Sequence, residues 1–199
     1  EQHLIENMDK DSCSLYISIP FCPSRCHYCS FVSYSSPKLL SLIDDYLEKL
    51  CFDISETVDM INALGLKLST IYIGGGTPTT LSEKQLNKLF STILQKIDVT
   101  EIDEFTLEAG RPDTITPAKL SEAKNAGVTR VSINTQTFND EVLEMIGRKH
   151  TSKDFYNAFE IARNSGIANI NTDLIAGLPY EDYDSFHKSF NDVYSMRPE

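Results

Sequence analysis

Five short β-type segments alternate with helical segments along almost the whole chain, and this alternation constrains the fold most strongly. The predicted strands are apolar and rich in β-branched residues, at residues 15–20, 67–73, 105–109, 129–133 and 167–175. The segments between them carry apolar residues at helical spacing, and two helices follow the fourth strand. This order predicts an α/β fold with parallel strands, either an open doubly wound sheet or a segment of a barrel.

Local signals predict where several helices begin. Ser82, with Gln85 three residues later, forms a capping box. Thr116 precedes a proline that suits the first helical position, so Thr116 is predicted to be an N-cap. Asn139 and Ser152 are predicted to begin the two helices after the fourth strand.

Composition and charge bound the class of protein. The chain has 199 residues, 41% of them hydrophobic, and a net charge of −11 from 18 basic and 29 acidic side chains. This charge disfavours nucleic-acid binding, which needs a basic surface. No apolar run approaches ~18 residues, so no membrane span is predicted. Residues 1–13 are polar and aperiodic, and we expect a linker remnant there, followed by one core domain at residues 14–199 of a longer protein.

Three of the five cysteines form a C-x3-C-x2-C run directly after the first predicted strand, at Cys22, Cys26 and Cys29. Closely spaced thiolates are typical ligands of iron–sulfur clusters. Three thiolates leave one iron of a cubane without a protein ligand, and an open metal site is where chemistry can occur. A zinc site would need a fourth ligand, for which His27 is poorly placed, and a disulfide framework is not typical of a chain this long. Of the other cysteines, Cys51 falls on an apolar helical stripe and is expected to be buried.

Polar or glycine-rich positions follow the other predicted strands, where ligands bind in α/β proteins. After the cysteines these positions are Gly74-Gly75-Gly76-Thr77, Glu108, Asn134 with Gln136, and Asp173. The triple glycine matches neither a dinucleotide-binding fingerprint nor a phosphate-binding P-loop. Glycine lets a backbone approach a ligand closely, so the segment is either a ligand-binding edge or a plain turn.

The cysteine run, with Tyr28 before the last cysteine, resembles the radical S-adenosylmethionine (SAM) superfamily. The segments at residues 16–22, 74–78, 108–112, 132–138, 146–148 and 172–179 together resemble the oxygen-independent coproporphyrinogen-III oxidase family, and within it the coproporphyrinogen dehydrogenase branch. The resemblance covers nearly all of residues 14–199. It implies a partial (β/α)6 radical SAM barrel, which we expect to be truncated before its last strand and to lack the family's C-terminal domain.

The resemblance also implies the cofactors and their ligands. A [4Fe–4S] cluster would be held by Cys22, Cys26 and Cys29, and its open iron would bind SAM. The positions that match SAM-contacting residues are Tyr16, Tyr28, Gly75, Gly76, Thr77, Glu108, Gln136, Arg148 and Asp173.

The family reaction is the oxidative decarboxylation of coproporphyrinogen III propionates to vinyl groups, which gives protoporphyrinogen IX in haem biosynthesis. The resemblance therefore implies an oxidoreductase with a tetrapyrrole substrate and an electron donor such as flavodoxin or ferredoxin. An oxidation-sensitive cluster implies the reducing cytoplasm. Arg111, Arg130 and Arg148 are candidates for contacts with anionic groups. We expect residues 1–199 alone to have weak or no activity.

Two positions differ from the well-studied oxidases. Ser18 stands where they carry histidine, and Phe31 stands where they carry a further cysteine. These differences leave the cofactor positions intact and concern the substrate. Two alternatives therefore stay open: a haem chaperone on the same fold, with His27 or His150 as an axial ligand, and a radical SAM enzyme with a different substrate.

Overall fold

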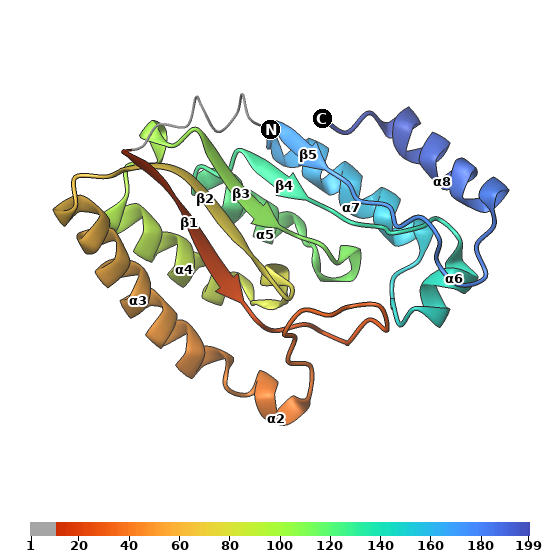
Figure 1. Ribbon diagram of the computed structural model, residues 1–199, viewed down its shortest axis with the longest axis horizontal. Coiled ribbons are helices and arrows are strands. Elements are labelled where there is room, and N and C mark those ends of the chain that lie inside the picture. Colours follow the sequence, from red (N-terminus) through yellow and green to blue (C-terminus); the bar gives the residue numbers. More distant parts are fainter. Residues whose placement is uncertain (1–10) are drawn as a thin grey trace.

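A five-stranded parallel sheet, in the order β1-β2-β3-β4-β5, lies at the centre of the structure (Figure 1). The structure is a computed structural model and describes residues 11–199. Its strands are β1 (Ser12–Ile19), β2 (Lys67–Gly75), β3 (Glu104–Glu108), β4 (Arg130–Ser132) and β5 (Asn169–Asn171). Each strand pairs in parallel with the next strand in the sequence, so the five carboxyl ends meet at one edge. The predicted α/β class is confirmed. Because the strand order never reverses, the sheet has the order of a barrel segment and not that of a doubly wound sheet.

Four helices connect the strands and cover one face of the sheet, behind it in Figure 1. They are α3 (Ile43–Ala63), α4 (Glu83–Lys96), α5 (Pro117–Asn125) and α7 (Ser152–Ser165), and they pack in that order, each against the next. The remaining helices are α2 (Pro37–Leu40), α6 (Asp140–Met145) and α8 (Tyr183–Met196), and the short 3-10 turns are η1 (Pro78–Thr80), η2 (Val99–Glu101) and η3 (Pro112–Thr114). Among the described residues, no helix combines the length and the apolar character needed to cross a bilayer.

The hydrophobic core lies between the sheet and these covering helices. Side chains alternate along a strand, so β2 places Ile71 and Ile73 in the core and turns Tyr72 to the opposite face. Ile17 and Leu107 extend the same layer from β1 and β3. Full burial of one such side chain contributes roughly 1.5–3 kcal/mol. The helix-covered face therefore stabilises the sheet, and the opposite face carries the polar and aromatic residues.

Several predicted helix ends are confirmed. Ser82 and Gln85 form the capping box of α4, with both reciprocal hydrogen bonds present. Thr116 caps α5 by accepting from Lys119 N–H, and Asn139 caps α6. In each case a side-chain oxygen accepts from a backbone N–H that the helix itself leaves free.

Other boundaries differ from the prediction. β1 begins at Ser12 and includes Cys13, whereas the predicted strand began at residue 15. The helical pattern after residue 37 divides into α2 and α3 at Leu42, a residue that is not helical. The N-cap of α7 is Thr151, and not Ser152, because Thr151 and Asp154 form a second capping box. β5 is limited to three residues. Most of the predicted linker at residues 1–13 lies outside the described residues.

Candidate cluster and nucleotide site

The C-x3-C-x2-C cysteines lie on a loop that follows β1 and is closed at its base. Tyr34 N–H donates to the Pro20 carbonyl (2.7 Å), and Cys22 N–H donates to the Tyr34 carbonyl (3.1 Å), so the two ends of the loop run side by side. Inside the loop, Cys29 N–H donates to the Cys26 carbonyl (3.2 Å). These backbone bonds hold the two ends of the loop together and shape its middle.

The tip of this loop is also tied to the end of α6. His27 N–H donates to the Ile146 carbonyl (2.9 Å), and His27 Nδ1 lies 2.8 Å from the Met145 carbonyl oxygen. A ring nitrogen that faces a carbonyl must carry the proton, so Nδ1 is the donor. Gly147 follows at a φ of +79°, and a Cβ there would lie 3.0 Å from the Arg25 carbonyl oxygen. Glycine thus allows the loop and the α6 end to approach closely.

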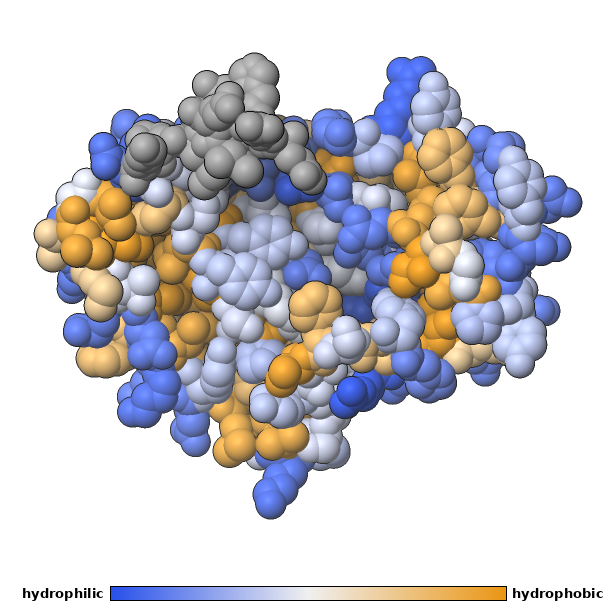
Figure 2. Space-filling view, viewed as in Figure 1, coloured by the Kyte–Doolittle hydropathy of each residue, from blue (hydrophilic) through white to orange (hydrophobic). Residues whose placement is uncertain are grey.

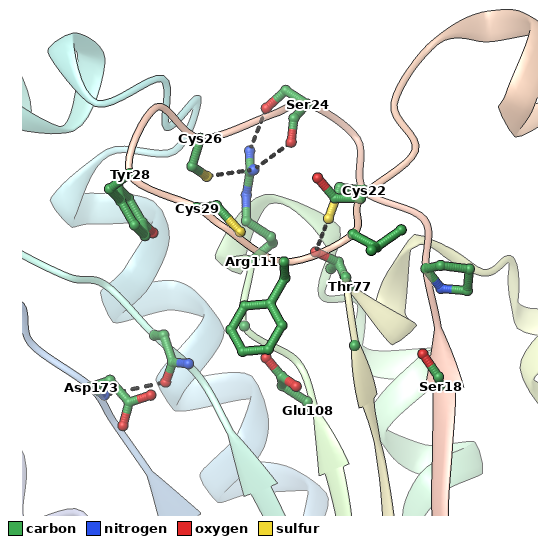
Figure 3. A pocket seen from close by; sticks show the side chains of 18 of the residues that line it. Ser18, Cys22, Ser24, Cys26, Tyr28, Cys29, Thr77, Glu108, Arg111 and Asp173 are labelled. Carbon is green, nitrogen blue, oxygen red and sulfur yellow. Dashed lines mark hydrogen bonds between the residues drawn. The ribbon is translucent and has the colours of Figure 1, made fainter.

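The three loop cysteines line one cavity of about 850 Å³. Figure 3 shows their side chains on the loop, beside the ends of the strands. Cys22 Sγ lies 3.3 Å from Thr77 Oγ1, and Cys26 Sγ accepts from Arg111 Nη1 at 3.5 Å. Burial raises the pKa of the Cys22 thiol, while the Thr77 hydrogen bond and the Arg111 charge oppose that rise.

The arrangement of these thiols fits a cluster better than a single ion. All five cysteines are free. Within residues 11–199, no three His, Cys, Asp or Glu side chains converge on one metal ion. A cubane needs thiolates that surround a space, because each thiolate binds a different iron. Three free thiols on one closed loop, facing a common cavity, meet that requirement.

Every residue predicted to hold the cluster or SAM lines this same cavity: Tyr16, Cys22, Cys26, Tyr28, Cys29, Gly75, Gly76, Thr77, Glu108, Gln136, Arg148 and Asp173. They come from β1, β2 and β3 and from the segments after β1, β2, β4, β5 and α6. The cavity lies at the carboxyl edge of the sheet, where α/β proteins bind ligands. Figure 2 shows the face of the sheet that the helices leave uncovered. This face is hollowed in the middle, and apolar groups gather on either side over the regions of α3 and α8.

The end of β2 is a glycine edge pressed against β1 and the cysteine loop. Gly75 has a φ of +111°, and a Cβ there would lie 2.9 Å from Ser18 Oγ. A Cβ on Gly76 would lie 3.0 Å from Cys22 Sγ. Gly76 N–H also donates to the Ile19 carbonyl (2.8 Å). The sequence alone left open whether these glycines form a plain turn, and in the structure they bring backbone to the cavity wall where a side chain would not fit.

Glu108, at the end of β3, is a half-buried acid beside this edge. Burial raises the pKa of Glu108 to about 7, and the negative charge of Asp173 adds to the rise. Hydrogen bonds from Gly75 N–H and the Tyr72 hydroxyl oppose the shift, as does the charge of Arg148. A cationic ligand group at this place would favour the ionised carboxylate. The site thus suits an ammonium group.

Arg148, which follows α6, supplies a buried cation on another wall of the cavity. Its Nε donates to the Tyr28 hydroxyl (3.1 Å), and its Nη1 donates to the Gly110 carbonyl (2.7 Å). Burial raises the pKa of Tyr28 to about 12, and the Arg148 charge opposes that rise. A guanidinium has about five N–H donors. Arg148 therefore keeps donors for an anionic ligand group.

The segments after β4 and β5 stay paired beyond the sheet. Gln136 N–H donates to the Asp173 carbonyl (3.1 Å), and Ile175 N–H donates to the Gln136 carbonyl (3.0 Å). Asn134 Oδ1 accepts from Asp173 N–H at 3.2 Å. Gln136 has a φ of +73°, a left-handed conformation that non-glycine residues rarely adopt. Backbone strain of this kind is typical of functional sites.

Several cavity residues were not predicted, and Tyr72 and Ser24 are two of them. Tyr72 stacks on Tyr16, with ring centroids 5.7 Å apart, and both rings belong to the cavity lining. Its signal in the sequence was its place between two core isoleucines, because alternation turns the middle residue to the other face. Ser24, between the first two loop cysteines, also lines the cavity. A serine at that position gives no signal by itself.

Three candidates for other roles lie away from the cavity lining. Arg130 pairs with Glu104 at 3.3 Å, so the structure does not bring it to the site as an anion contact. His27 is engaged with the α6 end, as described above. His150 is only 2% exposed, and burial lowers its pKa to about 4. Arg111, by contrast, is buried in the cavity wall. Cys51 is half-buried and packs against the core from α3.

Comparison with known proteins shows which family the chain is similar to. The family model described as the Radical SAM superfamily matches residues 16–193. The oxygen-independent coproporphyrinogen-III oxidase-like protein HemZ of Bacillus subtilis is 38% identical over 191 residues, which cover 96% of this chain and 38% of that protein. The heme chaperone HemW of the same organism is 43% identical over 190 residues, which cover 94% of this chain and 48% of that protein.

A solved structure of a radical SAM enzyme is also similar to this chain. The coproporphyrinogen III oxidase HemN from Escherichia coli, titled as a radical SAM enzyme, superimposes with a TM-score of 0.82 at 27% sequence identity. The match covers the whole of this chain and 45% of that one. The chain thus spans less than half the length of these relatives.

Proposed function

The chain belongs to the radical SAM superfamily, whose members use a [4Fe–4S] cluster and SAM, and we propose that it carries out the oxygen-independent oxidation of coproporphyrinogen III to protoporphyrinogen IX. The observation that carries the cofactor assignment is the convergence of all twelve predicted ligand positions on one cavity. The substrate assignment is supported by the likeness to HemZ and HemN, as their names describe them.

In this proposal, the thiols of Cys22, Cys26 and Cys29 bind the cluster, and the opposite walls of the cavity bind SAM. The glycine edge and Glu108 hold the ammonium group of SAM, and Arg148 pairs with its carboxylate. Gln136 and Asp173 bond the ribose hydroxyls, and Tyr16 and Tyr28 flank the cluster and the adenine.

The reaction removes one hydrogen atom from the β-carbon of a substrate propionate, then carbon dioxide and one electron, and leaves a vinyl group. Two such rounds convert two propionates. When bound, the cluster and SAM together supply the radical that takes the hydrogen atom. Phe31 and Val32, which are 68% and 65% exposed, lie on the cavity rim and offer an apolar surface to a tetrapyrrole ring. The electron that reduces the cluster would come from a flavodoxin or ferredoxin, and the electron released with carbon dioxide would pass to a separate one-electron acceptor. The cluster's sensitivity to oxidation suggests the cytoplasm.

A second candidate function is haem delivery, supported by the 43% identity to HemW and its description as a heme chaperone. Phe31 replaces the further cysteine of the well-studied oxidases, and this difference is compatible with the chaperone function. Neither histidine that was considered as an axial ligand lines the cavity. A haem site on this chain would therefore need ligands other than His27 and His150 in the positions described.

The test uses full-length protein, reconstituted without oxygen, with SAM, a reductant and coproporphyrinogen III. We expect a four-iron centre, formation of 5′-deoxyadenosine and loss of the substrate's propionates. Joint replacement of Cys22, Cys26 and Cys29 by alanine should abolish the centre. The matched control Cys51→Ala removes a thiol from α3, outside the cavity lining, and should keep it.

Each other outcome has a definite meaning. Absence of a four-iron centre in the natural sequence would overturn the cofactor assignment to these cysteines. SAM cleavage without decarboxylation would overturn the substrate. Stoichiometric haem binding without turnover of coproporphyrinogen III would establish the chaperone alternative instead.

A further inference from the structure

Arg111 is a buried cation directly beneath the cysteine loop. Its side chain is 4% exposed. Its Nε and Nη2 both face Asp113, at 3.1 Å from Oδ1 and 3.4 Å from Oδ2. On the other side, Nη2 donates to Ser24 Oγ (3.0 Å), and Nη1 donates to the Ser24 carbonyl (3.4 Å) and to Cys26 Sγ (3.5 Å). Figure 3 shows the guanidinium pointing up into the loop between Ser24 and Cys26.

The base of this side chain is fixed. Thr114 N–H and Thr114 Oγ1 both donate to the Arg111 carbonyl, at 3.0 and 2.7 Å. Pro112 begins the 3-10 turn η3 immediately after Arg111. A planar guanidinium on a fixed backbone presents its donors in one geometry. The bonds to the loop are therefore built into the segment that follows β3 and do not depend on a mobile surface side chain.

Arg111 differs in its partners from the other buried arginine of the cavity wall. Within residues 11–199, the buried arginines are Arg111 and Arg148. Arg148 contacts a tyrosine hydroxyl and a backbone carbonyl. Arg111 contacts a cysteine sulfur and the loop segment between two cysteines. Hydrogen bonds to ligand sulfurs are among the factors that set the reduction potential of an iron–sulfur cluster.

The charges near the cysteines determine whether the reduction potential of a bound cluster rises or falls. Reduction adds one negative charge to the cluster and its thiolates, and a nearby cation stabilises the more negative state. Burial strengthens that interaction, because little water screens it. Asp113 lies on the far side of the guanidinium and offsets part of its positive charge. Removal of the Arg111 charge and removal of the Asp113 charge should therefore change the potential in opposite directions.

We propose that Arg111 is a positioning residue that holds the cysteine loop through Ser24 and raises the reduction potential of the cluster through Cys26, while Asp113 limits the size of that rise. The inference rests on the proposed assignment of the cluster to the three loop cysteines. It concerns how readily the site accepts an electron and is independent of the substrate.

The experiment is a redox titration of reconstituted full-length protein, followed by electron paramagnetic resonance of the reduced cluster. Arg111→Gln removes the charge and keeps a side chain that can hydrogen-bond to Ser24. At a fixed potential near the midpoint, the ratio of reduced to oxidised cluster should fall about tenfold, equal to a shift of about 59 mV for a one-electron couple. Asp113→Asn removes the offsetting charge, and the ratio should rise.

Two further variants separate this electrostatic role from a structural one. Arg130→Gln also breaks an arginine–carboxylate pair, at 3.3 Å, but outside the cavity lining, and should leave the midpoint unchanged. Arg111→Lys keeps the charge and loses the fork geometry, so its midpoint should stay closer to that of the natural protein than the midpoint of Arg111→Gln does.

The outcomes are distinct. If the natural protein holds four irons and Arg111→Gln has the same midpoint, this inference is wrong while the proposed function stands. A shift of Arg111→Gln and Asp113→Asn in the same direction would also overturn it, because a purely structural disturbance acts that way. If Arg111→Gln fails to hold iron, Asp113→Asn decides: a raised midpoint supports the inference, and an unchanged midpoint overturns it. If the natural protein holds no cluster, the proposed function itself fails.

Discussion

At the scale of single residues, the protonation of Glu108 links the cavity to the charge of its ligand. A carboxyl group in water is ionised at neutral pH, but burial raises the pKa of Glu108 to about 7. Near that pH the group holds a proton about half of the time. A bound ammonium group favours the carboxylate and expels the proton. Glu108 therefore couples binding of a cationic group to pH.

We predict that SAM binding weakens on acidification because of Glu108. Below about pH 7, binding must first remove the proton, so affinity should fall up to about tenfold for each pH unit. Isothermal titration with SAM under anaerobic conditions, between about pH 5.5 and about pH 8, measures this slope. Glu108→Gln should bind SAM more weakly and lose the slope. The control Glu104→Gln, at the other end of β3, should keep the natural protein's affinity for SAM and its pH dependence. A pH profile of Glu108→Gln as steep as that of the natural protein would contradict the prediction.

At the scale of elements, the sequence predicted the strands and most caps because those signals are local. Alternating apolar residues and capping side chains act within a few residues, so Ser82, Thr116 and Asn139 could be assigned without tertiary information. Thr151 was missed in favour of its neighbour Ser152, since both residue types cap helices and only the contact with Asp154 decides between them. The division at Leu42 was missed because the apolar pattern continues through it.

The difference between local signals and long-range contacts also applies to the candidate site. The glycines, cysteines and strand-end polar residues could be identified from motif and position, and the structure places them around one cavity. The link from Arg111 to Ser24 and Cys26 spans about 85 positions in the sequence, and no local pattern encodes it. The left-handed backbone at Gln136 was also beyond prediction, because glutamine has no preference for that conformation.

The short connection between α6 and α7 contains a histidine that is buried without a well-formed hydrogen bond. Both ring nitrogens of His150 lack a partner with good geometry among the described residues. Burial lowers the pKa of His150 to about 4, and the nearby charges of Arg148 and Arg111 add to this while Asp113 opposes it. The folded protein therefore holds His150 neutral at a pH where the unfolded chain is already protonated.

We predict that His150 makes the fold less stable in acid. Between about pH 6.5 and about pH 4 the unfolded state binds the additional proton, so the free energy of unfolding should fall as pH falls, by roughly 3 kcal/mol in total. Glu108, whose pKa is raised, acts in the opposite direction over part of this range. The measurement is therefore the difference between the natural protein and His150→Gln in urea unfolding at several pH values. His187→Gln, on the exposed side of α8, is the control, and a difference that does not change with pH would contradict the prediction.

At the scale of the whole molecule, the continuous strand order places every strand end around one cavity, in a chain whose net charge is negative. The sheet runs from β1 to β5 without a reversal, so the cysteine loop at one side and Asp173 at the other face the same space. The net charge is −11. A charged reductant approaches through the field of the whole molecule before it reaches the positive charge of Arg111 or Arg148. The net charge of the chain and the charge of these two arginines thus have opposite signs.

We predict that the overall field controls the rate of cluster reduction by small reagents. Dithionite is anionic and should reduce the cluster faster as salt rises, because salt screens the repulsion, whereas the cationic radical of methyl viologen should become slower. The change between about 10 mM and about 300 mM salt should be severalfold in each case, since the screening length falls from about 30 Å to below 10 Å over that range. Anaerobic stopped-flow spectroscopy of the cluster's absorbance measures both rates on the same sample, and the pair of reagents controls for any effect of salt on the protein. The reverse pattern, with dithionite slower and methyl viologen faster as salt rises, would show instead that the buried arginines dominate the approach, and the field at the cavity mouth would then be positive despite the negative net charge.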